Sequence, residues 1–209
     1  MRKKLVTVIV LFALLLVPKP RICAQISTLD RSPKGLDSTS PAGPRMILII
    51  RHGEKPGDPD KEDKKNKDPN LSPRGYERAA ALAHVIPDNF VRPDYLFATH
   101  KSAHSLRPIE TITPLSNALH ENIEEEFKDD GFAALARKVL TDGKYANKVV
   151  LISWHHGKIP ELAHALGASD APDKWNGKVF DRVWEITFDS GKVSFLDLPQ
   201  KALPGDSDK

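Results

Sequence analysis

The sequence predicts an α/β fold: a three-layer sandwich in which helices flank a mainly parallel central sheet, completed by a C-terminal antiparallel β-hairpin. Short apolar runs, typical of strands buried on both faces, alternate with segments whose apolar residues recur at helical spacing. Such alternation is typical of a parallel sheet covered by helices on both sides. Near the end of the chain, apolar and polar residues alternate singly around Asp189–Lys192, which predicts the hairpin.

Three apolar runs predict the buried strands. The first, Met46–Ile50, contains only apolar residues and stops abruptly where charged residues begin. The others cover residues 95–99 and 149–152, and a short, weak strand is expected near Ile123. In a parallel arrangement the carboxyl ends of these strands would share one edge of the sheet, which is where ligands bind in open α/β folds.

Four segments with helical spacing predict the covering layers. The first helix begins with Ser72 as its N-cap and Pro73 in its first turn, and Pro87 is expected to end it. The other helices are expected to begin at Pro108, to cover residues 132–140, and to cover residues 159–166 with Gly167 as the C-cap.

The first residues are expected to be a targeting segment. A basic start precedes an apolar run over residues 5–17, which is too short to span a bilayer comfortably, and the small residue Ala24 offers a cleavage point. We predict a signal peptide over residues 1–24, and hence a secreted or periplasmic protein without membrane attachment after cleavage. A retained N-terminal anchor is the alternative. The further segments are a flexible lead-in (25–44), a folded domain (45–199) and a polar tail (200–209).

Composition narrows the classes of function. The chain has 31 Lys and Arg against 28 Asp and Glu, but the predicted signal peptide holds five of the basic residues and no acidic one. The remaining chain is slightly acidic, so its charge does not indicate a nucleic-acid partner. The only cysteine, Cys23, lies in the same segment, so the mature domain would have no disulfide, thiol nucleophile or zinc–thiolate site.

Loops after three of the predicted strands carry histidines and arginines. Arg51 and His52 follow the first strand, Arg107 lies between the second strand and its helix, and His155 and His156 follow the strand at 149–152. Guanidiniums present fixed forks of donors to phosphate oxygens. An imidazole can attack phosphorus when its other ring nitrogen donates to a group such as a backbone carbonyl. The set therefore predicts transfer of a phosphoryl group, with no metal or other cofactor required.

Four motifs resemble the histidine phosphatase superfamily, also called the phosphoglycerate mutase-like family. They are Arg51-His52-Gly53-Glu54, Leu71-Ser72-Pro73-Arg74-Gly75, Ser105-Leu106-Arg107-Pro108-Ile109-Glu110-Thr111 and Ser153-Trp154-His155-His156-Gly157. Their order and placement match over about residues 45–190, and the short chain resembles the compact branch. The resemblance implies that His52 becomes phosphorylated and that Arg51, Arg107 and His156 form the phosphate pocket.

The second histidine and the proton donor depart from the family's pattern. Because Trp154-His155 stands before the motif histidine, two histidines compete, and we choose His156 because it directly precedes Gly157. The compact branch usually takes its proton donor from a glutamate beyond the third strand, where this chain has residues 124–126. The candidates are Glu125, its neighbours Glu124 and Glu126, Glu54 beside the nucleophile, and Asp58.

Lysines near the rim of the site are expected to contact the substrate: Lys55, Lys101 and Lys158. The charged run 55–70 reads as a solvated loop, and the alternative is a lid over an anionic substrate that uses Lys55 or Lys61.

The sequence thus predicts an exported phosphatase that hydrolyses a small phosphomonoester through a phosphohistidine on His52. One alternative is a mutase, which returns the phosphoryl group to a substrate hydroxyl; export argues against it, because phosphoglycerate is intracellular. The other is a phosphate-binding protein without catalysis, since a fold alone does not prove activity. The natural substrate and the oligomeric state stay open at this point.

Overall fold

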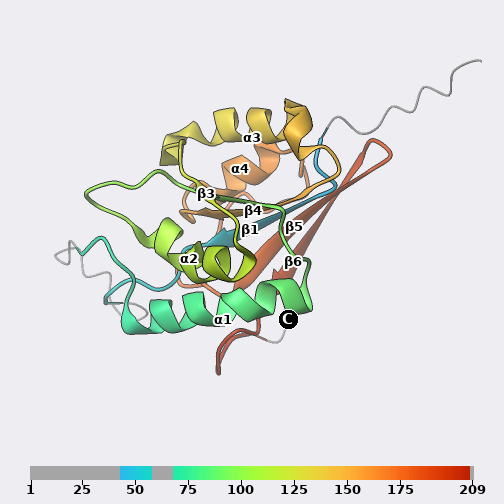
Figure 1. Ribbon diagram of the computed structural model, residues 1–209. Coiled ribbons are helices and arrows are strands. Elements are labelled where there is room, and N and C mark those ends of the chain that lie inside the picture. The colour runs from blue at the N-terminus through green and yellow to red at the C-terminus, as the bar shows by residue number, and fades with distance from the viewer. Residues whose placement is uncertain (1–42, 58–67, 208–209) are drawn as a thin grey trace, which may run out of the picture. The chain divides into compact units, whose positions relative to one another are not determined.

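The centre of the fold is a six-stranded sheet with the strand order β3-β2-β4-β1-β5-β6 (Figure 1). The computed structural model describes residues 43–57 and 68–207. The predicted signal peptide, almost all of the predicted lead-in, and most of the charged run 55–70 lie outside the described residues.

Four strands of the sheet pair in parallel, and the last two join the sheet through antiparallel pairing. The parallel strands are β1 (Met46–Arg51), β2 (Tyr95–Ala98), β3 (Ile123–Glu124) and β4 (Val149–Trp154). The antiparallel hairpin consists of β5 (Arg182–Asp189), which pairs with β1, and β6 (Lys192–Pro199), which forms the edge. The predicted mainly parallel sheet and its terminal hairpin are confirmed.

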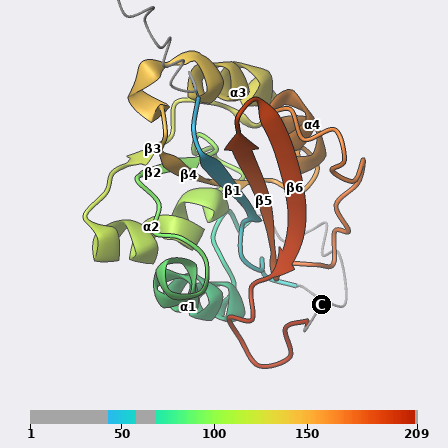
Figure 2. The ribbon, with the colours of Figure 1, turned by 90° about the vertical axis from the view of Figure 1, so that its right-hand side faces the viewer.

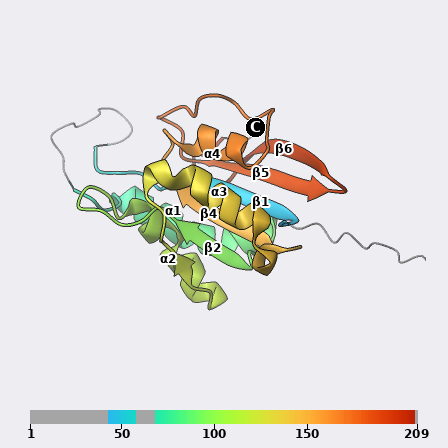
Figure 3. The same ribbon diagram turned by 90° about the horizontal axis from the view of Figure 1, so that it is seen from above.

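Helices cover both faces of the sheet (Figures 1 and 2). One layer holds α1 (Pro73–Asn89) and α2 (Arg107–Leu119), and the other holds α3 (Phe132–Thr141) and α4 (Ile159–Ala165). Two short 3-10 turns flank α3, η1 (Asp129–Gly131) and η2 (Gly143–Tyr145). Figure 3 shows α3 lying along the strands and α4 beside the hairpin.

The side chains of β1 alternate between two hydrophobic cores, as the pleat of a strand requires. Ile47 and Ile49 pack with α3 and α4, whereas Leu48 and Ile50 pack with α1 and α2. Every residue of β4 is likewise buried. Burial on both faces explains why these strands read as continuous apolar runs in the sequence.

Several element ends differ from the prediction by one or two residues, among them those of α1 and β4. α1 continues two residues past Pro87, to Asn89. Proline lacks an N–H group and would break the middle of a helix, but in the last turn the loss of one backbone hydrogen bond is tolerated. β4 is longer than the apolar run 149–152, because Ser153 and Trp154 also pair with neighbouring strands.

In the described residues, no helix is both long and apolar enough to cross a membrane. The predicted signal peptide and lead-in are not covered by this finding.

Candidate active site

The parallel register of β1 and β4 determines which residues meet at the candidate site. Arg51 and Trp154 are partners in that register, and the backbone N–H of His52 donates to the carbonyl oxygen of Trp154 at 3.1 Å. His52 and His155 are therefore the first residues after the ends of two neighbouring strands. Their ring centroids lie 5.1 Å apart, edge to face.

The ring of His52 is held in one tautomer. Its Nδ1 lies 2.7 Å from the carbonyl oxygen of Gly53, and because a carbonyl only accepts, Nδ1 must carry the proton. Nε2 then keeps its lone pair, which is the form that attacks phosphorus. Burial, with the charge of Arg51, holds the pKa of His52 well below its usual value. The imidazole is thus neutral at pH 7.

The loop that carries His52 is fixed by α1 and α2. The backbone N–H of Gly53 donates to Thr111 Oγ1 at 2.8 Å, and the same hydroxyl donates to the carbonyl of Arg107 at 2.7 Å. On the α1 side, a Cβ atom added to Gly75 would lie 2.4 Å from the carbonyl oxygen of Glu54. The glycine of the Leu-Ser-Pro-Arg-Gly motif therefore permits the close approach of helix and loop.

The structure brings His155, rather than His156, against the nucleophile. Burial, followed by the charge of Arg107, lowers the pKa of His155 to about 4. The ring of His156 instead faces the loop around Gly177, where a Cβ would lie 3.3 Å from its Nε2. The choice of His156 rested on its place directly before Gly157. The strand β4 extends to Trp154, so His155 is the first residue after the strand.

Arg51 is oriented by a loop that the motifs did not indicate. Its Nη1 donates to the carbonyls of Gly177 (2.6 Å) and Val179 (3.0 Å), and its Cζ lies 3.5 Å from the centre of the Phe180 ring. Phe180 also lies 6.4 Å from the His52 ring, centre to centre. Bonds to carbonyls and to an aromatic face orient a guanidinium without neutralising its charge.

Arg107 is the first residue of α2. Its Nη1 donates to the carbonyl of Asp68 at 3.0 Å and its Nη2 to that of His104 at 3.4 Å. Its charge helps to lower the pKa of both His52 and His155, which places it within electrostatic reach of the site. The predicted convergence of Arg51, His52 and Arg107 at the carboxyl edge of the sheet is thus seen in the structure.

The four acid candidates that the structure describes all pair with basic side chains: Glu54, Glu124, Glu125 and Glu126. Glu54 is buried, and both its oxygens accept hydrogen bonds from Arg78, with distances of 2.8 to 3.2 Å. Glu125 accepts from Lys101 Nζ at 3.0 Å. Burial would raise the pKa of Glu125, but the bonds from Lys101 prevail and lower it. Asp58 lies outside the described residues.

Asp129 is an acid that the sequence reasoning passed over. It opens η1, in the loop between β3 and α3, and its carbonyl accepts from the indole of Trp154 at 3.2 Å. Its Oδ1 is buried and accepts no hydrogen bond from the described residues. Burial raises the pKa of Asp129 to about 6, although Lys158 acts against the shift. In the sequence it stands in an acidic run, where only its burial distinguishes it.

The predicted lysine contacts have mixed surroundings. Lys101 pairs with Glu125. Lys158, which directly precedes α4, pairs with Glu161, with 2.9 Å between its Nζ and Glu161 Oε1. Lys55 lies at the edge of the described residues, and Lys61 lies outside them. Their role toward a substrate stays a prediction.

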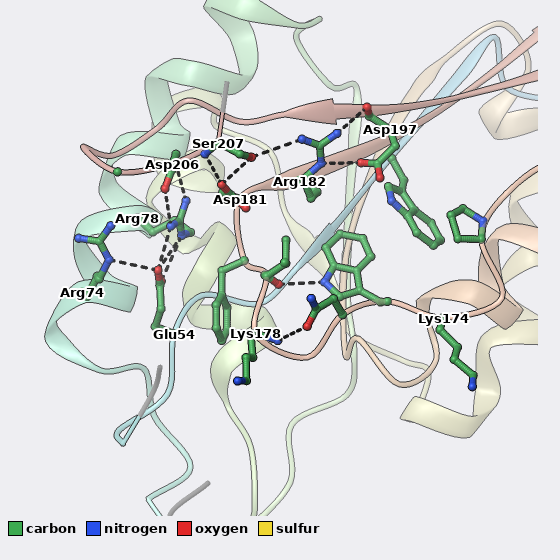
Figure 4. Close-up of a pocket in the computed structure, with 17 residues that line it drawn as sticks. Glu54, Arg74, Arg78, Lys174, Lys178, Asp181, Arg182, Asp197, Asp206 and Ser207 are labelled. Carbon is green, nitrogen blue, oxygen red and sulfur yellow. Dashed lines mark hydrogen bonds and ion pairs between the residues drawn. The ribbon is translucent and has the colours of Figure 1, made fainter. Parts of the chain in front are cut away.

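A cavity of about 800 Å³ adjoins the site (Figure 4). Phe180 borders both, since it lines the cavity and also contacts Arg51. The walls come from the loop 172–181, from Glu54, Arg74 and Arg78, and from the C-terminal residues 205–207. The motifs gave no sign that the loop 172–181 and the end of the chain would reach this region.

Comparisons with known proteins bear on the family and the fold. A family model described as the histidine phosphatase superfamily (branch 1) matches residues 47–130, which include the first three motifs. A search of curated proteins with the sequence gave no match.

Solved structures share the fold. Similar ones include a phosphoglycerate mutase from Bacillus anthracis (14% identity, TM-score 0.53, covering 75% of this chain and 94% of that chain). A phosphoserine phosphatase mutant from Entamoeba histolytica in complex with phosphoserine has 14% identity and a TM-score of 0.51 over 76% of this chain and 98% of that chain. The protein histidine phosphatase SixA complexed with tungstate has 14% identity and a TM-score of 0.51 over 74% and 97%. The predicted resemblance is confirmed: this chain has the histidine phosphatase fold, and residues 47–130 carry that superfamily's sequence pattern.

Proposed function

Starting from the histidine phosphatase fold, we propose that the protein is an exported phosphatase that hydrolyses a phosphomonoester through a phosphohistidine on His52. One observation carries the proposal: the Nδ1 proton of His52 is committed to the carbonyl of Gly53, so that Nε2 is left as a neutral nucleophile. Arg51, Arg107 and His155 surround this ring with groups that suit the oxygens of a phosphate.

In the first step, the lone pair on His52 Nε2 attacks phosphorus. The new N–P bond forms as the P–O bond to the alcohol breaks, and the alcohol oxygen takes a proton from a nearby acid. In the second step, water attacks the phosphohistidine and gives its proton to the same carboxylate. The N–P bond breaks, inorganic phosphate leaves, and His52 returns to its initial state.

Arg51 and Arg107 would hold the three oxygens of the transferring group. Little covalent chemistry is required of the protein in such a transfer, so positioning and charge stabilisation do most of the catalysis. Fixed guanidiniums supply both at any pH near neutrality, because they do not lose their charge.

We assign the second histidine role to His155. In the protein without ligand, the low pKa of His155 keeps it neutral at pH 7. A phosphate dianion placed between it and the arginines would favour the imidazolium, since an opposite charge nearby raises the pKa of a histidine. Binding of phosphate is therefore expected to draw one proton onto His155.

We assign the proton donor to Asp129. It lies in the loop beyond the third strand, and its enclosed Oδ1 accepts no hydrogen bond from the described residues, which favours the protonated form. With a pKa of about 6, a fraction of the side chain is protonated at neutral pH, which a general acid requires.

The first experiment measures phosphate release from p-nitrophenyl phosphate by the purified protein with EDTA present. We expect wild-type activity that EDTA leaves intact and that His52→Ala abolishes. His84→Ala, which removes an exposed histidine from α1, is the matched control and should retain activity. Activity that survives in His52→Ala would overturn the mechanism.

The mutase alternative shares the first step, so a second measurement separates the two. With radiolabelled 3-phosphoglycerate, a phosphatase releases inorganic phosphate, whereas a mutase moves the label to the 2-hydroxyl of the same molecule. Binding of phosphate without turnover of any monoester would instead favour the non-catalytic reading.

Export is tested apart from catalysis. The full chain, expressed in a bacterial host with two membranes, is expected in the periplasmic fraction with a mass that corresponds to a start at Gln25. A cell-associated chain of full mass would indicate a retained anchor or no export.

A further inference from the structure

Arg78 ties the nucleophile loop to the end of the chain (Figure 4). Its side chain is only 2% exposed. Nε and Nη2 donate to Glu54, which lies two residues after His52, and both terminal nitrogens donate to Asp206 at 2.9 Å. Nη1 also donates to Gln200 Oε1 at 3.0 Å. All five N–H groups of the guanidinium thus have an acceptor.

Asp206 is the centre of the C-terminal turn. Its Oδ2 accepts from the backbone N–H groups of Ala202 and Leu203 at 2.9 and 3.0 Å, in addition to Arg78. Only 4% of its side chain is exposed. Burial would raise the pKa of Asp206, but the bonds from Arg78 and from the backbone lower it. The segment predicted as a polar tail therefore packs against the domain through a buried carboxylate.

The next residue, Ser207, reaches the second loop. Its backbone N–H and its hydroxyl both donate to Asp181 Oδ2, at 2.6 and 2.9 Å. Asp181 directly follows Phe180, whose ring packs on the guanidinium of Arg51. Adjacent residues at the end of the chain thus hold the loops on either side of the site.

We propose that residues 204–207 form a clasp that sets the His52 loop and the Phe180 loop relative to each other. Asp206 acts through Arg78 and Glu54, and Ser207 acts through Asp181, so both are positioning residues for phosphoryl transfer. The proposal rests on the phosphatase function proposed above. Small displacements of a nucleophile or of an orienting arginine lower the reaction rate without unfolding the domain, because catalysis depends on ångström-level placement.

The test compares Asp206→Ala and Ser207→Ala with the wild type. We expect kcat on p-nitrophenyl phosphate to fall about tenfold in Asp206→Ala at a temperature where the variant remains folded. Ser207→Thr, which keeps the hydroxyl, should restore most of what Ser207→Ala loses. Asp189→Ala is the matched control, because this carboxylate lies at the hairpin turn. Among the described residues, its side chain accepts a hydrogen bond from its neighbour Ser190 alone.

Hydrogen exchange gives a readout that needs no activity, so failure of the clasp can be told from failure of the phosphatase function. In Asp206→Ala, amides in residues 52–57 and 175–181 should exchange faster, while those of α3 stay at the wild-type rate. Unchanged exchange in both loops would overturn the clasp, as would a uniform increase over the domain, which would mean a loss of global stability alone.

Discussion

The rings of His52 and His155 stand 5.1 Å apart, edge to face, because they follow paired residues of two neighbouring parallel strands. The contact joins positions that are far apart in the sequence and gives the site two neutral imidazoles in the absence of ligand.

Removal of the ring of His155 should damage catalysis more than removal of that of His156. We expect His155→Ala to lower kcat/KM for p-nitrophenyl phosphate by about a hundredfold, a loss typical of one electrostatic contact to the transition state. His156→Ala should lose less than tenfold, since this ring faces Gly177. Steady-state kinetics on both variants decides the assignment, and the reverse ranking would return the role to His156.

Phosphate binding should take up a proton. The pKa of His155 is about 4 without ligand, and an anion beside it would raise that value toward neutrality. Titration calorimetry of tungstate binding at pH 6, in buffers of different ionisation enthalpy, measures the proton directly. His155→Gln should bind the anion with no such uptake, whereas an equal uptake in this variant would place the proton on another group.

The free energy of unfolding should fall as the pH is lowered from about 6.5 to 4. The unfolded chain protonates His52 and His155 near pH 6.5, but the folded chain does not, so the unfolded state binds more protons in this window. Each histidine contributes a slope of at most about 1.4 kcal/mol per pH unit. Asp129 opposes it, because its raised pKa makes the folded state bind the extra proton between 3.8 and about 6.

Urea unfolding at several pH values tests this slope. His155→Gln should be less pH-sensitive than the wild type over the same window. An unchanged slope would mean that His155 is charged in the folded protein.

The effect of Asp129→Asn should depend on the leaving group. Asparagine cannot donate a proton as an acid does, so monoesters of alkyl alcohols should be hydrolysed about a hundredfold more slowly. The leaving group of p-nitrophenyl phosphate is p-nitrophenolate, a stabilised anion that needs little protonation. Hydrolysis of this substrate should therefore be affected far less. A linear free-energy plot over a series of leaving groups measures the difference, and the same treatment of Glu125→Gln serves as the control.

Gly75→Ala should destabilise the domain. The added Cβ would meet the backbone oxygen of Glu54 at 2.4 Å, and neither the helix nor the loop can yield without moving the site. We expect a loss of about 2 to 4 kcal/mol in the free energy of unfolding, in the range of other overpacking changes. Gly143→Ala, where the Cβ would meet no atom within 4 Å, should stay close to the wild type in denaturant unfolding.

Hydrophobic periodicity predicted the sheet, the helices and the hairpin, because each buried strand and each apolar helix face leaves a local pattern. The positions of Arg51, His52 and Arg107 were equally accessible, since motifs at strand ends converge in this fold class. The second histidine was harder: the end of β4 depends on pairing of Trp154 with Arg51, which no local pattern records.

The roles of Glu54 and of the chain end depended on tertiary contacts. Glu54 ends the nucleophile motif, but its partner Arg78 is a helix residue that also donates to Asp206, far along the chain. Asp129 resembled its acidic neighbours until its burial was known. The role of a polar residue can be assigned only when its partners in the fold are known, and those partners are distant in sequence.

The pairing of β1 also sets the order in which the domain can be assembled. Both neighbours of this strand, β4 and β5, are made long after it, so the nucleophile remains on an unpaired strand until the last third of the chain exists. Long-range pairing of this kind slows folding. A fragment of the chain that ends before β4 therefore lacks both the pairing partner of the nucleophile strand and His155, so it cannot hold the complete site.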